Sequence, residues 1–295
     1  MTGIVLPDPR RHAYRGDLAA EALRGLVEAP RFVEGESRQV AAPSLPLRRA
    51  PRFDAPLDTE VLLGETVTVY DESEGWAWAQ LSRDRYVGYM PSEGLTPRLA
   101  APTHRISALR TYVYPEPDGR TPPLALLSLN ARITAAREES KFLVLAAGGY
   151  VAATHAVAVG TNEPDFVTVA EAFLGTPYLW GGRTSIGLDC SGLVQLALEA
   201  AGHPVPRDAD MQAQEFGQAV EWRPGADLAR GDLVFWEGHV GIMTNATDFL
   251  HANAFHMAVV AEPFTHAQAR IKAAGYDVTC VRRLPGSGST PASKS

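Results

Sequence analysis

Cys190 is the residue in this chain best suited to act as a nucleophile. It follows Asp189 and precedes an apolar stretch that ends at Gly202, a pattern that predicts a helix with Asp189 as its N-cap. A thiol in the first turn of a helix lies near free backbone N–H groups and the positive end of the helix dipole, and both favour the thiolate. The same N–H groups could bind the oxyanion of a tetrahedral intermediate. A lone cysteine is equally compatible with a small side chain packed beneath a helix.

Two histidines could supply the base that a nucleophilic cysteine requires. His239 begins a predicted strand after the turn at Glu237-Gly238, and His251 lies in the next predicted strand. The two rings share a face only if His239 lies opposite an odd-numbered residue such as Asn253, a register that the sequence does not fix. In that register His251 could hold the ring of His239 while His239 takes the thiol proton, and the imidazolium would lower the pKa of the thiol further. Each histidine alone is also compatible with a solvated or capping residue.

A zinc site is the other common use of cysteine and histidine together. The chain contains neither a C-x-x-C nor an H-E-x-x-H motif, and its two cysteines, Cys190 and Cys280, are far apart in the sequence. We therefore expect no metal and no other cofactor, and we interpret His256 as a pocket-wall or surface residue. With only two cysteines, no disulfide framework is expected.

The composition limits the classes of partner. The 295 residues carry a formal net charge of −7, which argues against nucleic acid or an anionic membrane as the main partner. No apolar run approaches the ~20 residues that are needed to span a membrane. The first residues lack the basic and then apolar pattern of a secretory signal, so we expect a cytoplasmic location.

The elements that precede the candidate nucleophile fall into three regions. Residues 1–42 form an extension in which a short helix is expected from Asp17 to Glu28. Residues 43–100 contain short alternating runs separated by Gly, Asp and Pro, which predicts a small antiparallel barrel. Residues 101–160 repeat the order and spacing of its last three strands, which indicates a second barrel, although a single larger β domain is also compatible. Both copies resemble bacterial SH3-like barrels.

The region 161–285 carries the candidate nucleophile and bases. Helices are expected at 166–174, from 190 to 202, at 208–216 and at 265–274, and strands at 231–236, 239–244, 249–252 and 278–282. Helices that precede an antiparallel sheet are typical of an α+β fold. The Gly-, Ser- and Pro-rich residues 286–295 are expected to form a disordered tail.

Five ordered motifs make this region similar to the NlpC family of papain-like cysteine peptidases, which act on bacterial cell walls. The motifs are Tyr178-Leu-Trp-Gly-Gly182, Asp189-Cys-Ser-Gly-Leu193, Pro206-Arg-Asp208, Leu228-Ala-Arg-Gly-Asp-Leu-Val-Phe235 and His239-Val-Gly-Ile242. The resemblance implies Cys190 as the nucleophile, His239 as the general base and then acid, and His251 as the orienting third member. It also implies that Tyr178 lies beside the oxyanion position and that Trp180 lines the substrate groove, unless Trp180 packs in the core.

Two SH3-like barrels ahead of such a domain resemble the subgroup of γ-D-glutamyl-L-diamino acid endopeptidases. Those enzymes cleave murein peptides between D-Glu and the diamino acid, usually meso-diaminopimelate, and require a free N-terminal L-Ala. The resemblance therefore implies a murein tripeptide or tetrapeptide as the partner. The lack of a secretory pattern in the first residues favours a role in cell-wall peptide recycling over attack on intact wall. It leaves open whether lysine can replace diaminopimelate.

The subgroup also implies how the amine end of the substrate is bound. Asp189 and Ser191 would face the substrate ammonium, with Asp208 nearby, although Asp189 could act as an N-cap alone. Tyr86 would close the same end of the groove from the first barrel, or it could belong to the core of that barrel. A carboxylate and a hydroxyl in a closed end select a free amine, because a blocked amine leaves them unpaired.

Two other functions are compatible with these residues. A thiol-dependent amidase or acyltransferase of the same fold would use Cys190 and His239 to form an acyl-enzyme, and the sequence separates it poorly from a peptidase. A protein that binds peptidoglycan peptides would hold its ligand with the barrels and leave the thiol idle. An intact Cys-His-His set argues against this last function.

Overall fold

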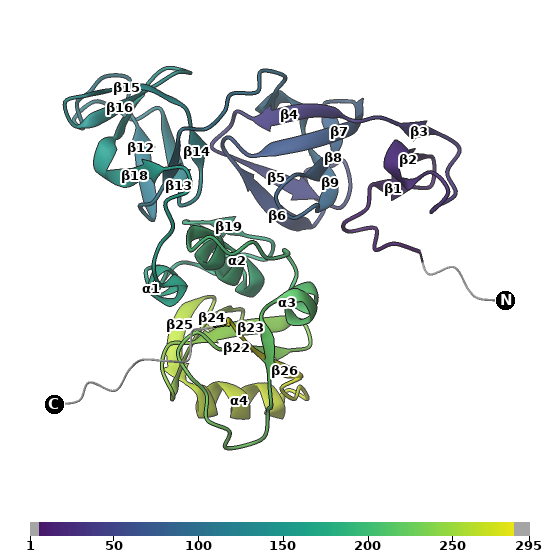
Figure 1. Cartoon of the computed structure of the whole chain (residues 1–295), viewed down its shortest axis with the longest axis vertical. Helices are drawn as coiled ribbons and strands as arrows, with labels where there is room; N and C mark the ends of the chain where they lie inside the picture. Colours follow the sequence, from purple (N-terminus) through teal and green to yellow (C-terminus); the bar gives the residue numbers. More distant parts are fainter. Residues whose placement is uncertain (1–5, 286–295) are drawn as a thin grey trace. The chain divides into compact units, whose positions relative to one another are not determined.

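The computed structural model describes residues 6–285 and divides into two compact units, with the boundary in the chain between Thr161 and Asn162 (Figure 1). The predicted disordered tail, 286–295, lies outside the described residues. Of the helices in the described part of the chain, the longest has 11 residues, which is too short to cross a bilayer.

The N-terminal extension forms short strands where a helix is predicted. Its elements are β1 (Tyr14–Arg15), β2 (Leu18–Ala20), the 3-10 turn η1 (Glu21–Leu23) and β3 (Phe32–Val33). β2 pairs with both β1 and β3, and Leu18 is buried in a cluster that includes Trp78. The predicted helix at 17–28 is wrong, because packing of these apolar residues overrides a weak helical periodicity.

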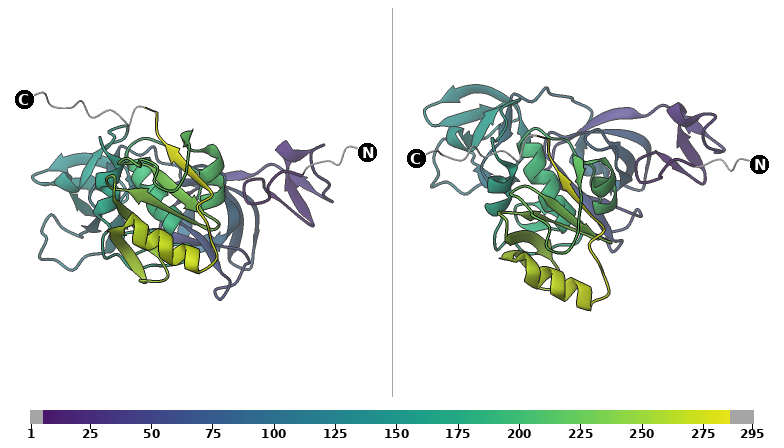
Figure 2. Two further views of the ribbon diagram at one scale, coloured as in Figure 1. Left: turned by 90° about the horizontal axis from the view of Figure 1, so that it is seen from below. Right: turned by 60° about the horizontal axis from the view of Figure 1, so that its bottom comes forward.

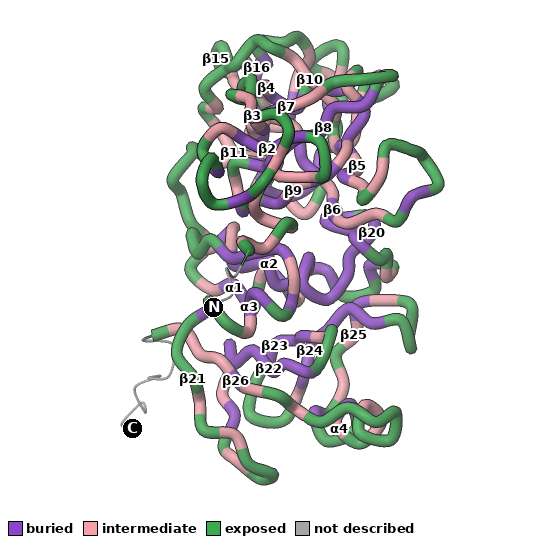
Figure 3. Tube along the Cα trace, turned by 90° about the vertical axis from the view of Figure 1, so that its right-hand side faces the viewer, coloured by how far each residue is buried: buried purple, intermediate pink, exposed green. Residues whose placement is uncertain are grey.

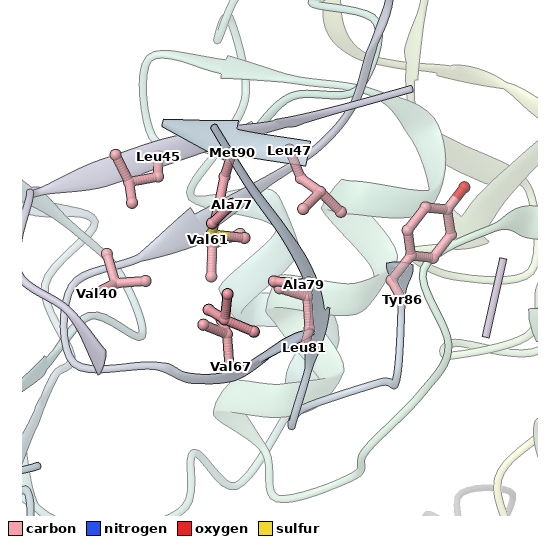
Figure 4. Packing of buried hydrophobic residues seen from close by; sticks show 11 residues of the cluster. Val40, Leu45, Leu47, Val61, Val67, Ala77, Ala79, Leu81, Tyr86 and Met90 are labelled. Atoms are coloured by element: carbon pink, nitrogen blue, oxygen red, sulfur yellow. The ribbon is translucent and has the colours of Figure 1, made fainter. Parts of the chain in front are cut away.

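The region predicted as the first antiparallel barrel contains a seven-stranded antiparallel sheet. In spatial order its strands are β10 (Leu95–Thr96), β4 (Glu36–Val40), β7 (Thr66–Ser73), β8 (Trp76–Leu81), β9 (Val87–Pro91), β5 (Ser44–Arg48) and β6 (Leu57–Leu62). The sheet therefore begins at Glu36, ahead of the predicted boundary at residue 43, and η2 (Ser92–Gly94) precedes its last strand. Alternating apolar residues fill the interior (Figure 4).

The next region consists of shorter antiparallel strands. They are β11 (His104–Ile106), β12 (Arg110–Val113), β13 (Ala125–Ser128), β14 (Arg132–Ile133), β15 (Ala135–Glu139), β16 (Phe142–Leu145), β17 (Tyr150–Ala152) and β18 (Ala156–Ala158), with the 3-10 turn η3 (Ala153–His155) before β18. β15, β16 and β17 pair in sequence order, as β7, β8 and β9 do. A second SH3-like barrel at residues 101–160 stays a prediction.

In the second unit a six-stranded antiparallel sheet lies between helices. Its strands are, in spatial order, β21 (Gln218–Val220), β26 (Cys280–Arg283), β22 (Leu233–Trp236), β23 (His239–Met243), β24 (Asp248–Asn253) and β25 (Ala258–Pro263). β21 and β25 are additional to the predicted strands. The helices are α1 (Phe166–Glu171), α2 (Cys190–Ala200), α3 (Ala209–Glu215) and α4 (Phe264–Ala273), and the short hairpin of β19 (Arg183–Thr184) and β20 (Gly187–Leu188) precedes α2.

α2 is the central helix of this unit. It packs on β23 and β24 from one side, and α4 packs on β24 and β25 from the other (Figures 1 and 2). Every residue of α2 except Glu199 is buried (Figure 3). A helix that is apolar on nearly all sides requires cover all round, and here that cover holds the first residue of α2 in a fixed place.

Candidate active site

Asp189 caps the helix that begins with Cys190. Its Oδ1 accepts a hydrogen bond from the backbone N–H of Gly192 at 2.7 Å, as the predicted N-cap requires. Its Oδ2 accepts a second from the N–H of Gly181 at 2.9 Å, which ties the glycine-rich approach to the start of the helix. A Cβ at Gly192 would lie 2.3 Å from the carbonyl oxygen of Gly182, so a larger residue does not fit there. The motif thus fixes the position of the thiol.

The sulfur of Cys190 lies against the start of β23. The backbone N–H groups of Val240 and Ser191 hydrogen-bond to it, and Val240 directly follows His239. Burial, and then the negative charge of Asp189, raise the pKa of the Cys190 thiol to about 12, although these N–H groups oppose the shift. The predicted low pKa is therefore wrong for the free protein. Loss of hydration outweighs a helix-dipole effect of about 1 kcal/mol.

The two histidines meet in the register that the sequence leaves open. β23 and β24 pair Ile242 with Leu250, and the same register, continued, places Asn253 opposite His239. Nε2 of His239 lies 2.9 Å from Nδ1 of His251, with the ring centres 5.1 Å apart. The shared face required for a pair of interacting histidines is confirmed.

Both imidazoles are poor proton acceptors in their resting surroundings. Burial lowers the pKa of His239 to about 3, and the nearby charges of His251 and Arg270 add to the shift. Burial also lowers the pKa of His251 to about 4, although its hydrogen bond to Glu262 opposes the shift. Near pH 7 both rings are therefore neutral, and each carries one N–H and one lone pair.

Gly241 makes room for the second histidine. A Cβ at Gly241 would lie 2.8 Å from Cβ of His251 and 2.3 Å from Cζ of Phe249. The ring of Phe249 also packs against the ring of His251, with the ring centres 4.8 Å apart. The His-Val-Gly-Ile motif therefore carries both the candidate base and the space that its partner needs.

Glu262 and Arg270 continue the line of hydrogen-bonded side chains that begins with His239 and His251. Neither residue was predicted from the sequence. Oε1 of Glu262 lies 2.9 Å from Nε2 of His251. Arg270 donates to both carboxylate oxygens of Glu262, at 2.8 and 2.5 Å. Burial raises the pKa of Glu262, but the hydrogen bonds from Arg270 and His251 outweigh it and lower the pKa to about 2. A glutamate and an arginine eight residues apart form no recognisable sequence motif. Glu262 also lies on the strand β25, which is not among the predicted strands.

Arg207 is a further residue of the site that sequence reasoning missed. Its side chain is 1% exposed and donates to Oδ2 of Asp189 at 2.6 Å and to Oγ of Ser191 at 2.7 Å. Its cation offsets the charge of the carboxylate that the resemblance assigns to the substrate ammonium. Asp189 does act as an N-cap, and its contact with a substrate ammonium stays a prediction. An arginine between Pro206 and Asp208 carries no signal of this pairing by itself.

The remaining predicted residues of the second unit occupy different environments. Burial raises the pKa of Tyr178, and the nearby side chains of Cys190 and Asp189 raise it further. Trp180 is 64% exposed, so the core-packing alternative for it is wrong. Asp208 is half-buried at the N-cap of α3.

Tyr86 belongs to the first unit and is buried in the apolar cluster of the barrel, beside residues such as Leu47 and Leu81. Figure 4 shows its hydroxyl directed away from the other labelled side chains. The core alternative therefore accounts for its ring. Its role in closing a substrate groove stays a prediction.

A group of possible metal ligands surrounds the contact between His251 and Glu262. His251, His256 and Glu262 each offer a ligand atom within 4.8 Å of the others. Arg270, however, engages both oxygens of Glu262, and both ring nitrogens of His251 have hydrogen-bond partners. A cation would have to displace a guanidinium to bind here. His256 is exposed, as a surface residue would be.

Comparison with known proteins finds a matching family in each of the two units. Residues 47–95 match the bacterial dipeptidyl-peptidase SH3 domain, and residues 175–273 match the NlpC/P60 family. The γ-D-glutamyl-L-lysine dipeptidyl-peptidase of Bacillus subtilis is 33% identical over 223 residues, which cover 68% of this chain and 73% of that protein. A protein of the same name from Bacillus cereus is 26% identical over 204 residues, which cover 61% of this chain and 60% of that protein.

A solved structure shares the fold. The crystal structure of an NlpC/P60 family protein from Bacillus cereus has a TM-score of 0.71 and covers 84% of this chain and 99% of that chain, at 21% identity. The predicted α+β architecture, a papain-like domain with an SH3-like barrel ahead of it, is confirmed. From the matched domains and the similarity to the Bacillus subtilis protein along most of both chains, this chain belongs to the NlpC/P60 family and carries a bacterial dipeptidyl-peptidase SH3 domain.

Proposed function

We propose that this NlpC/P60 hydrolase is a cysteine peptidase that cleaves the γ-D-glutamyl-diamino acid bond of murein peptides. The observation that carries the proposal is the contact of Cys190 with the backbone of Val240, the residue that follows His239 of the hydrogen-bonded His239–His251 pair. The names of the two Bacillus relatives support this choice of bond, and they specify L-lysine as the diamino acid. For this chain we propose meso-diaminopimelate at that position, with lysine as the variant to be tested.

Cys190 is the proposed nucleophile and His239 the proposed base. Nε2 of His239 faces His251, so Nδ1 is the ring nitrogen left to take the thiol proton. Because the pKa of the thiol is raised and the pKa of His239 is lowered, the proton stays on sulfur in the free protein and moves as the sulfur attacks the carbonyl carbon. His239 then gives this proton to the leaving amine as the C–N bond breaks. Water attacks the acyl-enzyme and gives a proton to His239, and cleavage of the S–C bond frees the acid and returns the proton to sulfur.

The start of α2 is the proposed site for the oxyanion. Cys190 is the first residue of the helix, and the first N–H groups of a helix have no carbonyl partner within it. The N–H of Ser191 bonds to the sulfur and that of Gly192 bonds to Asp189, so the N–H of Cys190 is the proposed donor. Together with the hydroxyl of Tyr178, it would stabilise negative charge that develops on the carbonyl oxygen. The exposed ring of Trp180 would line the groove that holds the peptide.

We place the amine of the N-terminal L-Ala near Asp189, Ser191 and Asp208, with Tyr86 contributed by the first barrel. Arg207 reduces the preference for a free amine that Asp189 would otherwise give. Since it offsets the charge of Asp189, discrimination between a free and a blocked amine should be smaller than an unpaired carboxylate would give.

Turnover of defined peptides tests the proposal. The protein would be incubated with L-Ala-γ-D-Glu-meso-diaminopimelate, with the lysine peptide and with the N-acetylated form of each, and release of the diamino acid would be followed. Release from the free-amine peptides is expected, with Cys190→Ala as the inactive control. Lack of turnover of every peptide contradicts the proposed bond, and equal turnover of the acetylated forms contradicts recognition of the amine.

Two further measurements refine the proposed role. Faster turnover of the tripeptide than of intact murein supports a role in peptide recycling, and the reverse contradicts it. An intact-mass search for acylated product in the presence of an amine acceptor separates hydrolysis from acyl transfer.

A further inference from the structure

We propose that Glu262 and Arg270 are positioning residues that set the direction of the hydrogen bonds along the row His239–His251–Glu262, and so keep Nδ1 of His239 free to accept a proton. The proposal rests on the proposed function of His239 as the base. It assigns a role to a strand and a helix that lie outside the five sequence motifs.

Arg270 fixes the carboxylate from α4. Its Nη1 donates to Oε2 of Glu262 at 2.8 Å and its Nη2 donates to Oε1 at 2.5 Å, a two-pronged contact that sets the orientation of the carboxylate plane. The same guanidinium lies 4.6 Å from the centre of the Phe255 ring, so it is held on a second side.

The sheet register brings this carboxylate to His251. In the pairing of β24 with β25, His251 lies opposite Val260 and Phe249 lies opposite Glu262. Glu262 is therefore a diagonal neighbour of His251 on the same face of the sheet, within reach of a long side chain. The resulting distance between Nε2 of His251 and Oε1 is 2.9 Å.

The chemistry of the carboxylate then determines where the protons lie. An ionised Glu262 can only accept, so the hydrogen in its contact with His251 must be on Nε2 of that ring. A neutral His251 consequently has its lone pair on Nδ1, and the hydrogen between the two histidines must be on Nε2 of His239. Nδ1 of His239 is left with a lone pair, which is the form that a general base needs.

Glu262→Gln tests this assignment because a glutamine has one acceptor oxygen for the two donors, Arg270 and His251. We expect kcat to fall about 10- to 100-fold with little change in KM, as for other residues that hydrogen-bond to a ligand or base and orient it without contacting the substrate. Glu171→Gln is the matched control, since Glu171 also pairs with an arginine, Arg230 at 3.0 Å, but its pair has no contact with a histidine of the row. Wild-type kcat in Glu262→Gln overturns the proposal.

A double-mutant comparison separates positioning from a general structural effect. If Glu262 acts through His251, then Glu262→Gln lowers kcat in the wild-type background and has no further effect in a His251→Ala background. Equal losses in both backgrounds overturn the proposal. Thermal unfolding of each variant, followed by circular dichroism, shows whether a loss of rate is only a loss of fold.

The ¹⁵N shifts of the two histidines give a readout that needs no turnover. We expect the Nε2–H form for both His239 and His251 in the wild-type protein, and a mixture of forms for His251 in Glu262→Gln. An Nδ1–H form of His251 in the wild-type protein overturns the proposal, even if Glu262→Gln does not fold. Failure of the peptide assay together with the expected shifts rejects the proposed function instead, so the two failures are distinguishable.

Discussion

Two carboxylate–arginine pairs support the proposed reaction from opposite ends, and they differ in what their oxygens do. Next to the nucleophile, the carboxylate of Asp189 accepts hydrogen bonds from the backbone N–H groups of Gly181 and Gly192 and from Arg207. Next to the histidines, one oxygen of Glu262 lies within hydrogen-bond distance of Nε2 of His251, and Arg270 donates to both oxygens of Glu262. The first pair therefore fixes the backbone, and the second fixes the position of protons.

The two carboxylate–arginine pairs also differ in how deeply the arginine is buried. The Arg207 side chain is 1% exposed and that of Arg270 is 25% exposed. A deeply buried charge left without its partner costs several kcal/mol, whereas a partly exposed ion pair contributes little to stability. This difference predicts that substitutions in the Asp189–Arg207 pair mainly lower the free energy of unfolding. Substitutions in the Glu262–Arg270 pair should mainly lower kcat.

Removal of the reacting groups should have the largest effect. Cys190→Ala should abolish turnover, and His239→Ala should lower kcat by at least about 10⁴-fold, because the nucleophile and its base act as one unit. His251→Ala should keep a larger residual rate, since orientation contributes less than proton transfer. Single-turnover assays on the murein tripeptide measure these rates. Residual turnover by Cys190→Ala would show that the sulfur is not the nucleophile.

The two arginines provide the direct test of the comparison. Arg207→Met leaves the charge of Asp189 buried and should lower the free energy of unfolding by about 3–5 kcal/mol. Arg270→Met should lower it by about 1 kcal/mol or less, and should reduce kcat because the carboxylate of Glu262 is no longer held. Urea unfolding and turnover would be measured on both variants. Equal losses of stability would remove the distinction between the pairs.

Gly241→Ala should disturb the histidine row from within the sheet. The added Cβ would lie 2.3 Å from the ring of Phe249 and 2.8 Å from Cβ of His251, so the strands must shift, at about 1–3 kcal/mol of stability and with a lower kcat. Gly16→Ala is the matched control, since a Cβ there meets no atom within 4 Å. An unchanged kcat in Gly241→Ala would show that the row tolerates displacement.

The pH dependence of stability should report the two neutral histidines. Their pKa values in the folded protein, about 3 for His239 and about 4 for His251, lie below the ordinary value of 6.5. Between pH 6.5 and about 4 the unfolded chain therefore binds protons that the folded protein does not, and stability falls as the pH falls. We expect each histidine to account for about 1–2 kcal/mol between pH 7 and pH 5. Urea unfolding at both pH values would show a smaller difference in His251→Ala than in the wild-type protein, and an unchanged difference would mean that His251 is not buried in its neutral form.

The amino-acid sequence by itself determined the elements that carry local signals. The N-cap and apolar face predicted the helix that begins with Cys190, and alternation between turns predicted the strands of His239 and His251 as well as the first barrel. The same reasoning failed at residues 17–28, where a few apolar residues fit a helix and a strand equally well, and the neighbouring barrel side chains favoured the strand.

Only the tertiary structure decided how these elements work together. The register that pairs His239 with His251, the approach of Glu262 and Arg270 from β25 and α4, and the contact of Arg207 with Asp189 all join residues whose separation in the sequence carries no signal. The raised pKa of Cys190 likewise depends on loss of water around the thiol, which the first turn of a helix does not determine. Caps and alternation depend on neighbours in the chain, whereas register, burial and charge pairing depend on which surfaces meet when the chain folds.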